Sequence, residues 1–175
     1  MAVARASAHR FSKPCVDAIH LLDGLGVEGD AHCGATVKHR SRLARGAHTP
    51  NLRQVHLLHA ELLDALADAG FAVAPGDLGE NVTTRGAELL ALPTDSLVHL
   101  GPSAVVRITG LRNPCMQIEA FRPGLLAQVL RRLPGGDMQR LMGVMGVVAA
   151  GGDVQAGDTI ELELPPPPHR ALAAV

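Results

Sequence analysis

Aromatic side chains are almost missing from this 175-residue chain, which has no tryptophan or tyrosine and only three phenylalanines. Stacking on aromatic rings is a common way for proteins to hold single-stranded nucleic acids. The formal net charge is −1, so the chain also lacks the excess of positive charge that attracts nucleic acids and anionic membranes. We therefore expect neither a nucleic-acid partner nor a membrane partner.

Long apolar runs and paired cysteines are missing as well. Residues 1–12 hold several basic side chains and no continuous apolar stretch, so neither a signal peptide nor a membrane span is predicted. The three cysteines, Cys15, Cys33 and Cys115, are odd in number and widely spaced, which argues against a disulfide framework. We expect a protein of the reducing cytoplasm.

The composition that remains predicts one globular domain over residues 1–175. Apolar residues make up 47% of the chain and charged residues 19%, which excludes a disordered chain. The length leaves room for a substantial core, built from Val, Leu, Ile, Ala and Met. Neither an internal repeat nor an interdomain linker is evident.

Short strands separated by Gly and Pro turns dominate the pattern. We expect helices over 60–69, where Leu62, Leu63 and Leu66 form an apolar stripe, over 124–133, and as a turn before Phe121. The expected strands cover 3–8, 17–22, 52–58, 80–84, 96–100, 104–111, 144–150 and 159–164, with a hairpin about Gly101-Pro102. The pattern therefore predicts a mainly β (α+β) fold. We expect a mixed β-barrel with a few short helices rather than a doubly wound sheet.

The loop at 23–34 contains glycines at 24, 26, 29 and 34, which indicates unusual backbone angles or close approach of a ligand. The first three match a dinucleotide-binding fingerprint only superficially. No helical pattern follows, and residues 38–49 form a polar, basic stretch, so the strand, loop and helix that such a site requires are missing.

Cys115 stands out because it lies just beyond the predicted strand 104–111. Arg112, Asn113 and the rigid Pro114 connect the strand to it. A nearby cation favours the thiolate, which attacks electrophiles and binds soft metals. The alternative is that Cys115 is a small buried apolar residue, as many intracellular cysteines are.

Four stretches in one order resemble the molybdenum cofactor sulfurase C-terminal domain family, called MOSC, in its small stand-alone bacterial form. They are Gly26-Val27-Glu28-Gly29-Asp30-Ala31-His32, Arg53-Gln54-Val55-His56-Leu57, Gly76-Asp77-Leu78-Gly79-Glu80-Asn81-Val82-Thr83-Thr84-Arg85-Gly86 and Thr109-Gly110-Leu111-Arg112-Asn113-Pro114-Cys115. A closing turn and strand at 151–160 extends the match, so the MOSC domain is expected over about 15–164, with a Pro-rich tail at 165–175.

The resemblance implies a barrel of the pyruvate-kinase β-barrel-like type and a role around the molybdenum–pterin cofactor (molybdopterin). In relatives that reduce N-hydroxylated compounds the family cysteine ligates molybdenum, and here that residue is Cys115. A protein thiolate suits molybdenum as a soft ligand beside the dithiolene sulfurs. Arg112 could lower the thiol pKa or reach the pterin phosphate, or it could be a solvated surface arginine.

Polar side chains at 80–84 suit a pterin, because amides and hydroxyls supply both donors and acceptors. We assign Glu80, Asn81, Thr83 and Thr84 as candidate cofactor contacts, and strand alternation would put Asn81 and Thr83 on one face and Thr84 on the other. The alternative is that these residues only close a turn.

Asp30 could orient His32, which would then act as a proton donor and join Cys115 as a catalytic candidate. Asp30 could instead only satisfy backbone amides of the loop. His39 and Arg42, from the one basic cluster, are candidates for holding the pterin phosphate. Nine histidines raise the possibility of zinc, but no standard ligand spacing is present.

Two functions stay open. The first is a molybdenum-dependent reductase of a small N-hydroxylated substrate, which needs an external electron donor because the sequence has no flavin signature or clustered cysteines. The second is a module that carries the cofactor, or a sulfur on Cys115, and serves a cofactor-delivery protein or partner enzyme.

Overall fold

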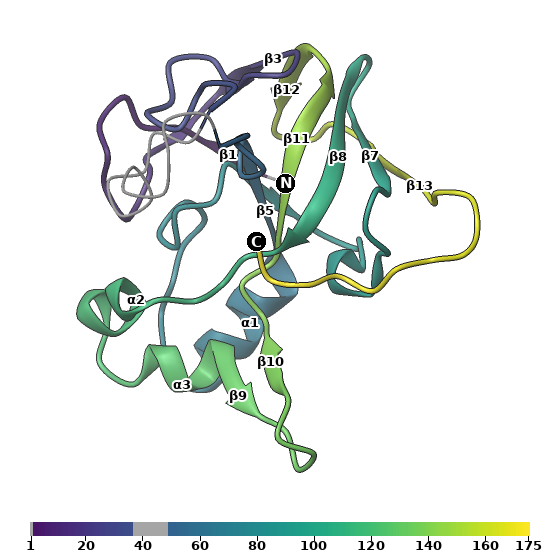
Figure 1. The fold of residues 1–175 in the computed structure, drawn as a ribbon. Helices are drawn as coiled ribbons and strands as arrows, with labels where there is room; N and C mark the ends of the chain where they lie inside the picture. Colours follow the sequence, from purple (N-terminus) through teal and green to yellow (C-terminus); the bar gives the residue numbers. More distant parts are fainter. Residues whose placement is uncertain (1, 37–48) are drawn as a thin grey trace.

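The computed structural model describes residues 2–36 and 49–175, and its centre is an eight-stranded sheet (Figure 1). Most neighbouring strands are antiparallel, and β5 and β6 are parallel. In spatial order the strands are β13 (Ile160–Glu163), β7 (Leu97–Leu100), β8 (Ala104–Leu111), β11 (Val144–Ala150), β5 (Val55–His59), β6 (Val82–Thr84), β1 (Ala2–Ala4) and β2 (Cys15–Val16).

Two smaller sheets and short helices complete the described fold. The smaller sheets are β12–β3–β4 (Gly152–Gln155, Ala18–Leu22, Gly26–Val27) and the hairpin β9–β10 (Leu130–Arg132, Met138–Arg140). The helices are α1 (Ala60–Asp68), α2 (Met116–Phe121), α3 (Leu125–Val129) and a 3-10 turn at Leu89–Ala91. The expected mainly β chain with few short helices is confirmed. Among the described residues, β13 and β2 are the two edges of the eight-stranded sheet, so the hydrogen-bonded strands of this sheet do not close into a barrel.

Alternation in β8 explains why this segment is a central strand. Ala104, Val106 and Ile108 are buried, whereas Arg107 between them is exposed. Period-two burial is the pattern of a strand with one face on a core. The expected hairpin is confirmed, because β7 pairs with β8 around Gly101, which has a φ of 63° that glycine adopts without strain.

Two apolar clusters make up the core. The larger lies inside the sheets, and the smaller lies between the end of β5 and the helices, where the lobe of α1, α2, α3 and β9–β10 gathers at the lower end of Figure 1. The predicted stripe of α1 is confirmed, because Leu62, Leu63 and Leu66 are all buried there. No helix in the described ranges has the length and apolarity to cross a bilayer.

The helix predicted over 124–133 is half as long as expected. It ends at Val129, and Leu130 already has an extended backbone with a φ of −135°. Leu130–Arg132 then pairs with Met138–Arg140, so cross-strand hydrogen bonds take over where helical spacing alone predicted more helix. Three strand boundaries shift by two residues or more: β1 ends at Ala4, β5 begins at Val55 and β6 begins at Val82.

Gly143 lies where the chain passes between the two apolar clusters. It immediately precedes β11, and its carbonyl accepts a hydrogen bond from the Arg112 N–H. Its φ is 72°, and a Cβ there would strike the Leu57 carbonyl oxygen and lie 3.0 Å from the Leu58 Cα. Backbone atoms cannot move aside as the end of a side chain can.

We predict that Gly143→Ala lowers the free energy of unfolding by about 3 kcal/mol, from left-handed strain plus overpacking. Gly86→Ala is the matched control, because Gly86 has a φ of 74° and open space around its Cβ direction. The control should lose only about 1 kcal/mol in urea denaturation. Equal losses in the two variants would contradict the close approach at Gly143.

Candidate functional site

Asp30 is the centre of a buried polar cluster that begins where β4 ends. Its Oδ2 lies 2.9 Å from the Lys13 Nζ, and the two side chains are only 2% and 5% exposed. Its Oδ1 accepts the backbone N–H of His32 at 2.9 Å and lies 3.1 Å from the His32 Nδ1. The predicted contact between Asp30 and His32 is therefore present. Lys13, which we did not assign from the sequence, also bonds to Asp30.

Asn81 ties this cluster to the sheet. Its amide Nδ2 donates to the Asp30 Oδ2 at 3.1 Å and to the Ala4 carbonyl at 3.2 Å. Its Oδ1 accepts the backbone N–H of His56 at 3.2 Å. One buried amide thus connects the Asp30 loop with β1 and β5, just before β6 begins.

The electrostatics of the cluster favour an ionised Asp30. Burial acts to raise the pKa of this carboxyl, but hydrogen bonds from His32 and the Lys13 charge outweigh burial, so the pKa lies well below its usual range. Burial lowers the pKa of Lys13, and the nearby carboxylates Asp30 and Glu80 act in the opposite direction. A buried charge pair of this kind is stable only because each partner compensates the other.

Glu80 lies fully buried beside this pair. Its Oε1 accepts the Gly76 N–H at 2.7 Å and the Thr83 hydroxyl at 3.0 Å, while its Oε2 has no hydrogen-bond partner among the described residues. Burial raises the pKa of this carboxyl. The Thr84 hydroxyl donates to the Leu58 carbonyl at 3.4 Å. Apart from the Glu80 Oε2, the side chains of Glu80, Asn81, Thr83 and Thr84 are therefore bonded within the protein, and the two threonines bond to different partners.

His56 is a site neighbour that we did not assign from the sequence. It is buried on β5, and its Nε2 is 2.7 Å from the Met142 carbonyl, so Nε2 carries the hydrogen and donates it. Burial, followed by the positive charge of Arg112, lowers the pKa of His56 to about 3. His56 is therefore neutral at physiological pH.

Cys115 stands at the start of α2, as predicted, with an extended backbone and a partly exposed side chain. Its thiol donates a long hydrogen bond to the Gln117 Oε1, at 3.5 Å. The preceding Asn113 is held from the other side, because its Oδ1 accepts from the Arg140 Nε at 3.0 Å. No hydrogen bond or ion pair within the described ranges joins Cys115 to the Asp30 cluster.

Two candidates, His39 and Arg42, lie outside the described residues. Within the described ranges, no group of three His, Cys, Asp or Glu side chains is arranged to hold a metal ion. A lone thiolate such as that of Cys115 suits a metal that brings most of its own ligands. His9 is a further neighbour, since its ring meets that of His32 edge-on at 5.1 Å.

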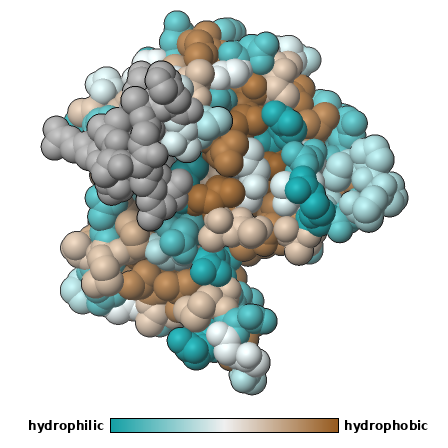
Figure 2. All heavy atoms as spheres, in the orientation of Figure 1, coloured by the Kyte–Doolittle hydropathy of each residue, from teal (hydrophilic) through white to brown (hydrophobic). Residues whose placement is uncertain are grey.

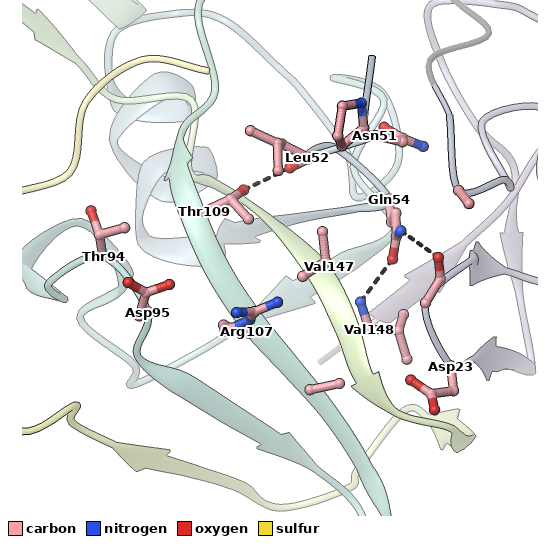
Figure 3. Close-up of a pocket in the computed structure, with 14 residues that line it drawn as sticks. Asp23, Asn51, Leu52, Gln54, Thr94, Asp95, Arg107, Thr109, Val147 and Val148 are labelled. Atoms are coloured by element: carbon pink, nitrogen blue, oxygen red, sulfur yellow. Dashed lines mark hydrogen bonds between the residues drawn. The ribbon is translucent and has the colours of Figure 1, made fainter. Parts of the chain in front are cut away.

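A hollow of about 660 Å³ lies outside this cluster, on the outer face of β8 and β11 (Figure 3). None of the predicted site residues that fall within the described ranges lines it. The Gln54 amide bridges its wall, donating to the Gly24 carbonyl at 2.6 Å and accepting from the Val148 N–H at 2.9 Å. Asn51 connects the hollow to the cluster, because its amide donates to the His32 carbonyl at 3.0 Å.

Comparison with known proteins identifies relatives of the whole fold. A family model described as "MOSC domain" matches residues 44–161. The crystal structure of the YuaD protein from Bacillus subtilis is 26% identical with a TM-score of 0.75, and the match covers 94% of each chain. YiiM from Escherichia coli is 21% identical with a TM-score of 0.61, over 97% of this chain and 71% of that one, and shows the shared fold. No curated protein sequence matches significantly.

Removing one member of the buried pair should cost far more than removing an exposed pair. We predict that Lys13→Met lowers the free energy of unfolding by about 3–5 kcal/mol, because Asp30 is left charged and uncompensated. The double variant Lys13→Met/Asp30→Asn should recover a large part of that loss. Arg85→Met, which breaks the exposed Arg85–Asp64 pair, is the control and should change stability little.

Chemical denaturation of the four proteins measures these differences. If the double variant is as unstable as Lys13→Met alone, the uncompensated Asp30 charge is not the cause of the loss.

His56 should make the fold sensitive to acid. The folded protein keeps His56 neutral down to pH about 3, whereas the unfolded chain takes up a proton below its ordinary pKa of 6.5. Stability is therefore lost as pH falls from 6.5 towards 3. Between pH 7 and pH 4 the His56 contribution is about 3 kcal/mol, and His56→Gln should abolish it. Denaturation curves at the two pH values test this, and identical pH dependence in the two proteins would rule it out.

Proposed function

This chain belongs to the MOSC domain family, and we propose that it holds the molybdenum–pterin cofactor with Cys115 as a metal ligand and reduces N-hydroxylated compounds. The observation that carries the proposal is the state of Cys115. Its thiol is partly exposed and stands at the start of a helix. Among the described residues its one hydrogen bond is a long one, to the neutral amide of Gln117.

The residues present fit such a group. A thiolate is a soft ligand suited to molybdenum, and we propose that Arg112, three residues before Cys115, pairs with the anionic phosphate. In our proposal His39 and Arg42 assist Arg112 at the phosphate. Glu80, Asn81, Thr83 and Thr84 are buried and bonded within the protein, so we propose that they shape the wall of the site and hold Asp30.

The proposed reaction breaks the N–O bond of the substrate. It consumes two electrons and two protons and releases an amine and water. When bound, the cofactor supplies the electron pair. The protein's part is to deliver protons and orient the substrate, and the electrons must be replaced by an external donor.

His32 is the proposed proton donor. The ionised Asp30 carboxylate holds the His32 Nδ1 at 3.1 Å, which leaves Nε2 as the nitrogen that can give a proton to the leaving oxygen. The His32 side chain is 34% exposed, so substrate and solvent can reach it. Lys13 acts through Asp30 as a positioning residue, because it keeps that carboxylate ionised inside the protein.

The surroundings of the thiols support a cytoplasmic setting. Cys15, Cys33 and Cys115 are all free, which suits a reducing compartment. A carrier role remains the second candidate, since the same accessible Cys115 thiol could hold a transferred sulfur.

We predict that the protein purified from a cofactor-replete host contains nearly stoichiometric molybdenum, and that Cys115→Ser loses it. The substitution nearly conserves shape, but a serine hydroxyl is a poor soft ligand at neutral pH. Cys15→Ser is the matched control, because that exposed thiol hydrogen-bonds to the Pro75 carbonyl, which serine can also do. Mass spectrometry of the metal content measures the difference.

Retained molybdenum and retained reductase activity in Cys115→Ser would overturn the ligand assignment. No metal in any of the three proteins would favour the carrier role. A persulfide on Cys115, seen as added sulfur mass that dithiothreitol removes, would then be the expected finding.

A further inference from the structure

Positive charge is concentrated in the segment that follows β8. Residues 112–140 contain five arginines and two carboxylates, a net charge of +3, whereas the whole chain has a net charge of −1. The arginines of this basic lobe are Arg112, Arg122, Arg131, Arg132 and Arg140. Such an asymmetry indicates a surface that attracts an acidic partner.

One of the two carboxylates of the lobe is held by backbone amides and forms no ion pair with a described arginine. The Glu119 carboxylate is turned to the start of α3, where it accepts the Gly124 N–H at 2.8 Å and the Leu126 N–H at 3.3 Å. Arg131 and Arg132 are exposed on β9, and the Arg132 side chain makes no hydrogen bond or ion pair with any described residue. The hairpin that carries them projects beyond the helices in Figure 1.

The basic lobe lies against the candidate site. Arg140 of the hairpin holds Asn113 with a 3.0 Å hydrogen bond, two residues before Cys115. Met116, directly after Cys115, is 68% exposed, and Leu133 at the hairpin turn is 41% exposed. Apolar and charged groups lie side by side on this lobe in Figure 2. Exposed apolar side chains among arginines are typical of a protein-binding surface.

We propose that the basic lobe is the docking surface for an acidic electron-transfer protein. This inference rests on the proposed reductase function, in which each turnover takes two electrons from the donor and oxidises it. Docking here places the donor next to Cys115, where the electrons are needed. A protein is favoured over a nucleic acid because Met116 and Leu133 offer apolar anchors, whereas phosphates would need only the charges.

Binding of two acidic probe proteins, a flavodoxin and a plant-type [2Fe–2S] ferredoxin, tests the surface on the cofactor-loaded protein. We expect Arg132→Glu to weaken the dissociation constant at least tenfold at low salt, and raising the salt should narrow the difference. Arg107→Glu is the matched control. Arg107 is also exposed on a strand, and its side chain makes no hydrogen bond or ion pair with any described residue, but it lines the hollow on β8 instead of the basic lobe. The control should change binding less than twofold.

Turnover with dithionite-reduced methyl viologen separates the two claims, because this small mediator needs no docking surface. Equal viologen activity in wild type and Arg132→Glu, with weakened protein binding only in Arg132→Glu, supports the proposal. Three results, each obtained while viologen activity is present, would overturn the docking surface alone. They are equal effects of the two substitutions on protein binding, no binding of either acidic protein, and tighter binding of a DNA duplex than of the acidic proteins. Absence of viologen activity from loaded protein would instead defeat the reductase function.

Discussion

The structure depends on the burial of one carboxylate. Asp30 lies in the interior with almost no solvent contact, and an isolated charge there would be very unfavourable. Lys13, His32, the Ala6 N–H and the Asn81 amide all bond to it. These partners come from segments far apart in sequence, so compensating this single charge fixes the N-terminal segment, the glycine-rich loop and the start of β6 relative to one another.

The second constraint is the junction between the sheets and the helical lobe. Arg112 leaves the end of β8 and bonds to the Gly143 carbonyl, so the segment leading to Cys115 is tied to the segment leading into β11. On the far side Asn113 is held by Arg140. The thiol therefore stands at the start of α2, where the chain passes from the central sheet into the basic lobe, whereas the proposed proton-handling residues Asp30 and His32 lie in the glycine-rich loop after β4. In our account the proton-donating residues belong to the part of the molecule that holds Asp30, and the basic lobe is the surface that receives the electron donor.

Local patterns predicted the elements whose cause is local. An apolar stretch after the Gly101-Pro102 turn identified β8, and the leucine stripe identified α1, because each pattern reflects packing against one core. The helix after Gly124 was predicted too long because β9 owes its conformation to pairing with β10, which helical spacing does not reveal. Likewise, Lys13 and His56 acquire their environments from distant residues, such as Met142, 86 positions beyond His56. A lysine next to Pro14 and a histidine in an apolar strand were the only signals available.

The most direct test of the account is X-ray absorption at the molybdenum edge of the loaded protein. If Cys115 is a ligand, the metal has one sulfur neighbour more than the dithiolene pair supplies, and this neighbour disappears in any Cys115→Ser protein that can be reconstituted with cofactor. An unchanged number of sulfur neighbours in the two proteins would contradict the central claim, because the cofactor would then bind without the thiol on which the proposed site is built.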